Sequence, residues 1–396
     1  MVAHSAVITG IGIVTAMGVG VEANWQALTD GSAPVVDADR FAPYPVHPAP
    51  EIDWSEQIPK RGDQRQMEAW QRLGTYAAGL ALDDAGIKGD EALTGTMDMI
   101  VAAAGGERDV AVDAMILAEA AAGRNDIGVL INEKLTTELR PTLFLAQLSN
   151  LLAGNISIVH KVTGSSRTFM GEEGAAMSAV QTAVARIRAG QSTHALVGAA
   201  FNAEHPDMLL GYEMNRHLAR GPWKPVAERA SGEGGGLVAG SGGVFLVIEE
   251  ARHAAARGAA VHAAIGPVAV DAGDAEATPS RLERLANETG LDDADMIVSA
   301  NSGALARNAA EAALAAARWP ERPVRAIANK TGHLREAQFP LAIAVAALSI
   351  AKGRPVAPLE AAEASAGGPP GTIGVVALGH QVAEAMVRIS TPEQAR

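Results

Sequence analysis

The sequence predicts an α/β protein built from two similar halves. Short, continuously apolar segments such as Val7–Val14 alternate with longer segments of helical periodicity such as Met67–Ala85. The run Asp98-Met-Ile-Val recurs as Asp295-Met-Ile-Val, about half a chain length further on. Alternating strands and helices indicate α/β layers, and the repeat indicates an internal duplication.

Both copies of the repeat stand in the same context. Each follows a predicted helix that ends in a glycine and an aliphatic residue, Gly86-Ile87 and Gly290-Leu291. Each half also contains a late apolar strand, at 195–198 and at 373–377. Strands that are apolar throughout are typical of sheets buried on both faces. The break between the halves is placed after the segment that ends at Gly258, which divides the chain into 1–258 and 259–396.

Composition excludes several classes of function. The 396 residues carry a net charge of −13 and only 4% aromatic residues, which argues against a nucleic-acid partner. The chain has no cysteine, so disulfides, cysteine-ligated zinc, iron–sulfur clusters and a thiolate nucleophile are all excluded. The apolar content of 48% is ample for a large core.

The sequence predicts a cytoplasmic protein without a membrane span. No basic region precedes an apolar stretch near Met1, so no signal peptide is expected. The longest apolar runs, such as Phe339–Ala351, are shorter than a membrane span.

Common sequence motifs for cofactor and metal binding are incomplete or missing in this chain. Gly10 and Gly12 follow a predicted strand, but the third glycine of a dinucleotide fingerprint is replaced by Thr15. The glycine-dense stretch 232–243 leads into a strand rather than a helix, which favours a tight loop with close backbone contacts over a phosphate cradle. The ten histidines show no ligand spacing, and no Gly-x-Ser-x-Gly elbow occurs. Neither a cofactor nor a metal is expected.

The segment 154–174 is unusual because it brings two acidic residues, Glu172 and Glu173, to the start of a buried helix. The apolar face of that helix and its glycine terminator are Met177, Val180, Val184, Ile187 and Gly190. Acidic residues complement the helix dipole there, worth about 0.3–1 kcal/mol near a surface. The alternative is that this helix start is a site where an anion or a nucleophile would sit. The residues alone leave both interpretations open.

The order of motifs resembles the β-ketoacyl-acyl-carrier-protein synthases of the thiolase superfamily. The matching segments are the N-terminal 7–18 with Trp25 and Leu28, Arg65-Gln-Met67, Leu139-Arg-Pro141, 154–158, 240–250 and Thr331-Gly-His-Leu334. The resemblance extends over nearly the whole chain. It implies a thiolase-like fold of two pseudo-duplicated halves in five α/β/α/β/α layers, with dimerisation insertions in the first half.

The resemblance also locates the site. The family uses a cysteine at a buried helix start and two histidines to decarboxylate malonyl-carrier protein and condense it with an acyl chain. By this resemblance Glu173 stands at the cysteine position, Asn301 at the first histidine position and His333 at the second. The usual lysine is replaced by Ala328, and Leu378 stands in the segment that forms the family's substrate gate.

These replacements predict that condensation is lost. A carboxylate is a poor acceptor for an acyl group, because the mixed anhydride is labile in water. Asn301 can donate a hydrogen bond but cannot carry a proton. His333 is then either a remnant of the reaction or a structural histidine. An ion pair between Glu173 and Arg167 or Lys330 would compensate a buried charge.

Three functions agree with this resemblance. The first is a condensation-inactive, chain-length-factor-like partner of a Cys-containing synthase in fatty-acid or polyketide-type chain elongation. The second is a malonyl-ACP decarboxylase that primes chains, and the third is a non-catalytic acyl-binding scaffold. An ionised Glu173 would repel a malonate carboxylate, which weakens the second.

The partners implied are the acyl carrier protein and a Cys-containing β-ketoacyl synthase in a heterodimer, with a homodimer as the alternative. Four basic residues resemble the family's docking surface for the acidic carrier protein: Lys60, Arg61, Arg65 and Arg72. The same residues are also compatible with an ordinary solvated helix face.

Overall fold

A mixed sheet of 12 strands organises the computed structural model, which describes residues 4–141, 143 and 147–395. The N-terminal segment in which no signal peptide was expected starts at Met1, and its first three residues lie outside this described part. In the first half of the sheet the strand order is β5 (Ser166–Met170), β4 (Asp98–Ala103), β6 (His194–Phe201), β10 (Gly242–Glu250) and β1 (Ala6–Thr15). In the second half it is β14 (Val324–Ala326), β13 (Met296–Ser299), β15 (Thr372–Leu378), β16 (Glu384–Ser390) and β11 (Ala263–Ile265).

The two halves of the sheet repeat one pairing pattern. In each, the second strand runs parallel to the first and third, and the fourth runs antiparallel to the third and fifth. Strands β1 and β11 join the halves through three residue pairs. The two copies of Asp-Met-Ile-Val lie at equivalent strands, β4 and β13, so the repeated letters correspond to repeated structure.

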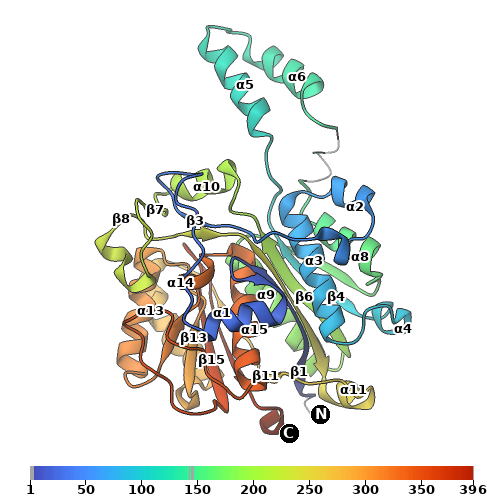
Figure 1. Cartoon of the computed structure of the whole chain (residues 1–396), viewed down its shortest axis with the longest axis vertical. Helices are drawn as coiled ribbons and strands as arrows, with labels where there is room; N and C mark the ends of the chain where they lie inside the picture. Colours follow the sequence, from blue (N-terminus) through green and yellow to red (C-terminus); the bar gives the residue numbers. More distant parts are fainter. Residues whose placement is uncertain (1–3, 142, 144–146, 396) are drawn as a thin grey trace.

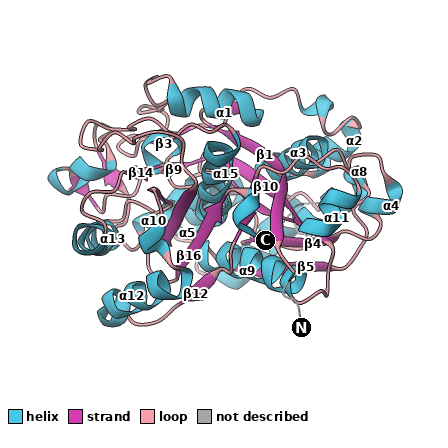
Figure 2. Cartoon of the chain, turned by 90° about the horizontal axis from the view of Figure 1, so that it is seen from below, coloured by secondary structure: helices cyan, strands magenta, loops and turns pink. Residues whose placement is uncertain are grey.

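Helices cover the sheet in the predicted layers. The helices α9 (Glu173–Arg188) and α15 (Gln338–Ala351) pack together in the middle, between the two halves of the sheet (Figures 1 and 2). Outside the first half lie α3 (Ala69–Asp84) and α8 (Leu151–His160). Outside the second half lie α12 (Thr278–Thr289) and α13 (Leu305–Arg318). The predicted α/β thiolase-like architecture is confirmed.

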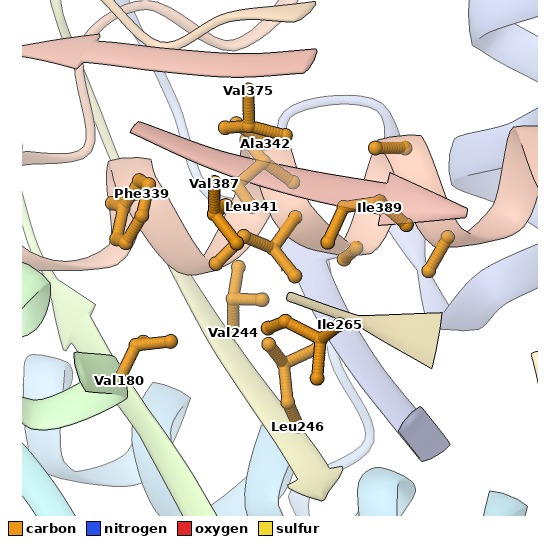
Figure 3. Close-up of a cluster of buried hydrophobic side chains, with 14 of the residues drawn as sticks. Val180, Val244, Leu246, Ile265, Phe339, Leu341, Ala342, Val375, Val387 and Ile389 are labelled. Atoms are coloured by element: carbon orange, nitrogen blue, oxygen red, sulfur yellow. The ribbon is translucent and has the colours of Figure 1, made fainter. Parts of the chain in front are cut away.

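The central helices and the two sheet halves share one hydrophobic core. Figure 3 shows part of it, with Val180 from α9 facing residues of α15 and of strands from both halves. The labelled partners are Val244, Leu246, Ile265, Phe339, Leu341, Ala342, Val375, Val387 and Ile389. Helix α15 is buried almost around its whole circumference, which explains why it is apolar without clear periodicity.

The remaining elements are short or peripheral. The strands are β2 (Gly18–Val19), β3 (Val46–His47), β7 (Ala219–Arg220), β8 (Glu233–Gly234), β9 (Ala239–Gly240) and β12 (Ala269–Asp271). The helices are α1 (Gly20–Thr29), α2 (Arg61–Gln66), α4 (Glu91–Thr94), α5 (Val110–Ala121), α6 (Ile127–Thr137), α10 (Pro206–Glu213), α11 (Ala251–Ala256) and α14 (Ala328–Thr331). Helices α5 and α6 form an arm that projects from the body (Figure 1). The predicted division at residue 258 falls between α11 and β11.

The glycine-dense stretch serves close backbone approach, as predicted. A Cβ on Gly240 would lie 1.8 Å from the carbonyl oxygen of Thr331, and one on Gly242 would lie 2.6 Å from that of Val14. Only glycine fits at these positions. Across the described residues, no helix is both long and apolar enough to cross a membrane.

Candidate functional site

The centre of the candidate site is Glu173, the first residue of α9. Its side chain is only 5% exposed, although the preceding Glu172 is half exposed. The chain reaches α9 from β5 through Gly171, which has a φ of 141°. The apolar face predicted for this helix packs into the central core, so the helix start is drawn inward with it.

Two histidines from the second half of the chain bind the Glu173 carboxylate. The Nε2 atom of His333 lies 2.5 Å from Oε1, and the Nδ1 atom of His380 lies 2.9 Å from the same oxygen. The backbone N–H of His380 also donates to Oε1, at 3.1 Å. Three hydrogen bonds therefore converge on a single carboxylate oxygen in the interior.

These bonds decide the protonation of the cluster. Burial alone would raise the pKa of Glu173, but the hydrogen bonds from His333 and His380 outweigh it and hold that pKa well below the ordinary value. Burial acts to lower the pKa of His380, yet the Glu173 carboxylate raises it overall. Burial prevails at His333 and lowers its pKa. The directions of these shifts favour an ionised Glu173, a protonated His380 and a neutral His333.

Aromatic residues close the site on one side. The Tyr212 ring lies edge-on to the His380 ring at 4.9 Å, and the His217 ring does so at 5.0 Å. Within the described part of the chain, the buried Tyr212 hydroxyl and the Nδ1 atom of His333 have no hydrogen-bond partner. The carboxylate of Glu172 lies 3.6 Å from the Nε2 atom of His380, on the side that faces solvent.

Asn301 does not join this cluster. Its Nδ2 group donates to Oδ1 of Asn308 at 2.9 Å, and its own Oδ1 accepts from the backbone N–H of Gly303 at 2.6 Å. It lines a separate groove of about 470 Å³ that also contains Ser299 and Glu311. Burial raises the pKa of Glu311 to about 7.

Comparison with known proteins identifies the family. The sequence model of the family described as beta-ketoacyl synthase, N-terminal domain, matches residues 4–254 of this chain. The chain belongs to the beta-ketoacyl synthase family. A further relative is the tetracenomycin polyketide synthase ketoacyl synthase beta subunit of Streptomyces glaucescens, 30% identical over 87% of this chain and 85% of that protein.

Two other similarities agree with this result. The 3-oxoacyl-[acyl-carrier-protein] synthase 2 of Vibrio harveyi is 26% identical, and the match spans 65% of this chain and 60% of that synthase. The solved ishigamide ketosynthase/chain length factor has the same fold, with a TM-score of 0.78 over 98% of this chain and 99% of that one, at 19% identity. The chain is thus a ketosynthase-like subunit similar to beta subunits of polyketide synthases.

The ion pair predicted for Glu173 has other partners than expected. Lys330 donates its Nζ proton to the backbone carbonyl of Ser32, and Arg167 is exposed on β5. The prediction of an ion pair with either residue was wrong, because His333 and His380 are the side chains that bind the carboxylate. One of them, His380, was not among the predicted site residues.

The segment around Leu378 borders Glu173 through its backbone. A Cβ on Gly379 would lie 2.2 Å from the carbonyl oxygen of Val382 and 3.2 Å from Oε2 of Glu173, so a side chain does not fit there. The Leu378 side chain is fully buried among Leu282, Leu285 and Met386, in the outer cluster of the second half. A gating role for Leu378 stays a prediction.

The four basic residues do not share one environment. Lys60, Arg61 and Arg65 are exposed on and beside α2. Arg72 lies on α3, half-buried, with its guanidinium 5.3 Å from the centre of the Trp54 ring. The surface available for an acidic partner is therefore formed by the first three residues, and carrier-protein docking stays a prediction.

Proposed function

We propose that this ketosynthase-like chain is the non-condensing, chain-length-factor-like member of a pair whose other member carries the nucleophilic cysteine. The observation that carries this proposal is the closed hydrogen-bonded cluster of Glu173, His333 and His380. The residue predicted to replace the nucleophile is held in place by the retained histidine, so neither is free to react.

Chemistry argues against acyl transfer at this position. Attack by Glu173 on a thioester would give a mixed anhydride, and the attacking oxygen already accepts three hydrogen bonds. Asn301 is bonded to Asn308 and cannot supply or remove a proton. Decarboxylation of a malonyl group is disfavoured as well, because the ionised Glu173 repels the malonate carboxylate.

The edge of the sheet supports pairing with a second chain. Strand β5 ends the strand order and pairs with β4 on one side. Its residue Met170 is 74% exposed, and an exposed strand edge readily accepts another strand. The arm formed by α5 and α6 exposes further apolar side chains, including Leu117 and Val129, and lies in the first half, where the resemblance predicts dimerisation insertions. We propose that the Cys-containing synthase covers β5 and this arm.

The acyl carrier protein is the second proposed partner. It is acidic by family resemblance, and Lys60, Arg61 and Arg65 present an exposed basic group near the start of α2. Reversing their charge should weaken carrier-protein binding to the pair, with stronger effects at low salt.

Co-expression with a Cys-containing synthase tests the pairing directly. We expect a stable heterodimer by size-exclusion chromatography, in which condensation is abolished by removing the partner's cysteine. Neither condensation nor release of carbon dioxide from malonyl-carrier protein should be measurable for the isolated chain. A homodimer that releases carbon dioxide would overturn the proposal.

The register of β5 allows a precise test of the interface. The Met99 N–H donates to the carbonyl of Ser165, so the backbone groups of residues 165, 167 and 169 face β4 and the N–H of Thr168 faces outward. Thr168→Pro removes that outward donor without breaking the pairing with β4, and it should dissociate the heterodimer. Thr168→Ala keeps the N–H and should leave the heterodimer intact.

A gain-of-function variant tests the predicted loss of condensation. Glu173→Cys in the isolated chain should not restore condensation, because Asn301 cannot replace the first histidine. Restored product formation by this single variant would show that Asn301 is no obstacle.

A further inference from the structure

We propose that Glu173, His333 and His380 form a binding site for a single zinc-class transition-metal ion. The three side chains each offer one ligand atom, and these atoms lie within 4.8 Å of one another. This site goes beyond the proposed function and holds whether or not the chain pairs with a synthase.

The donor set fits zinc. Two imidazole nitrogens and one carboxylate oxygen are a ligand set that zinc uses with bonds of about 2.0–2.2 Å. Magnesium and calcium prefer oxygen ligands, so two imidazoles disfavour both. Without the ion, Oε1 of Glu173 lies 2.5 Å from Nε2 of His333 and 2.9 Å from Nδ1 of His380.

Binding requires only a small expansion of the cluster. Ligand atoms around a tetrahedral zinc are separated by about 3.4 Å, as its bond lengths require. The two separations from Oε1 of Glu173 must therefore grow by less than about 1 Å, which side-chain torsions can supply. Imidazole and carboxylate groups bind a metal only in their deprotonated forms, so binding is expected to weaken at acid pH.

The backbone already holds the ligands in place. The N–H of His333 donates to the carbonyl of Val238 at 2.7 Å, and its carbonyl accepts from Gly240 at 3.0 Å. Glu173 is fixed at the start of α9, and His380 follows the end of β15 next to a glycine that admits no side chain. Ligands fixed in this way lose little conformational freedom when the metal binds.

The surroundings provide a second shell. The Glu172 carboxylate lies 3.6 Å from the Nε2 atom of His380, on the ring nitrogen that does not face the cluster. A carboxylate on the far nitrogen of a ligating histidine orients the ring and increases its basicity. Glu172 also adds a second negative charge near a divalent ion, and its side chain is half exposed to solvent.

An unused polar group lies beside the cluster. The Tyr212 hydroxyl is buried and, among the described residues, has no hydrogen-bond partner. Its ring packs against the rings of both His380 and His333. Such a hydroxyl can accept or donate a hydrogen bond to a metal-bound water in the fourth coordination position.

The test measures metal uptake by the full-length chain. After treatment with a chelator, the chain is titrated with Co²⁺, monitored by visible absorption, and the Co²⁺ is then displaced by Zn²⁺. We expect one metal per chain and a rise in Tm with zinc concentration, because the ion binds the folded state. Glu173→Gln and His380→Asn should each lower affinity by at least about 100-fold, and Glu172→Gln by about 10-fold.

The matched control is His262→Gln, which removes a histidine paired with Asp84 outside the cluster. It should bind zinc as the unchanged chain does. The proposal is overturned if the unchanged chain takes up no metal, or if Glu173→Gln binds as tightly. Diffraction from zinc-soaked crystals at the zinc edge gives a test without variants. The anomalous-difference peak of zinc must lie between the three side chains. A peak elsewhere, or the absence of a peak, contradicts the proposed site.

Discussion

Two buried carboxyl groups, Glu173 and Glu311, have pKa values that are shifted in opposite directions. Glu173 accepts hydrogen bonds from two histidines and one backbone N–H, and its pKa falls well below the ordinary value despite burial. Glu311 lies beside Ser299 and Asn301 without a hydrogen bond of ordinary geometry among the described residues, and burial raises its pKa to about 7. The comparison shows that donors, not depth, decide whether a buried acid stays charged.

The largest effect is expected from removing a partner of Glu173. His333→Ala should destabilise the chain by about 1.5–3 kcal/mol at neutral pH, because it removes a hydrogen bond from a buried carboxylate. Urea unfolding in the presence of a chelator measures the change.

The double variant His333→Ala with Glu173→Gln separates charge from packing. It should recover part of the lost stability, since a neutral amide is less costly to bury with fewer donors than a carboxylate. An equal loss in the single and double variants would mean that His333 acts through packing alone.

A smaller effect of opposite sign is expected at Glu311. Its folded-state pKa of about 7 lies above the ordinary 4.5, so the folded state holds a proton that the unfolded state releases between these values. Stability therefore falls as pH rises from about 4.5 to 7 and is flat above.

Glu311→Gln should remove this penalty and stabilise the chain by about 1–3 kcal/mol at pH 8. Unfolding curves at pH 5 and pH 8 provide the check, because the gain should shrink at the lower pH. Equal gains at both values would show that protonation is not the cause.

The smallest effect concerns the titration of His380. The Glu173 carboxylate raises the pKa of this histidine, so its contribution to stability is complete below about 6.5 and is lost as pH rises through the raised value. NMR titration of the His380 ring should give a midpoint above 6.5, and Glu173→Gln should lower it. A midpoint unaffected by the substitution would remove Glu173 as the cause.

Much of the architecture was readable from the sequence because it follows from local pattern. Apolar strands, the repeated Asp-Met-Ile-Val and the start of the helix at Glu173 all depend on residues close together in the chain. The placement of Glu173 and His333 within one site came from family resemblance, and the hydrogen bond between them agrees with it.

His380 escaped prediction because nothing local marks it. It lies 207 residues from Glu173, in the segment around Leu378 for which the resemblance predicts only a substrate gate. The available signal was topological: His380 follows β15, and the candidate residue Asn301 follows the adjacent parallel strand β13. Parallel strands end at the same edge, where ligands and charges gather. Spacing along the sequence does not report on such a cluster, since fold topology can assemble side chains from distant segments.

The position of β1 has a consequence for synthesis on the ribosome. Ile8 pairs with Ile248, so about 240 further residues must be synthesised before β1 can pair with β10. At about 5–20 residues per second this delay is roughly 12–50 seconds. During that time a ten-residue apolar strand has no partner in β10, and it is a candidate for capture by chaperones that bind nascent chains.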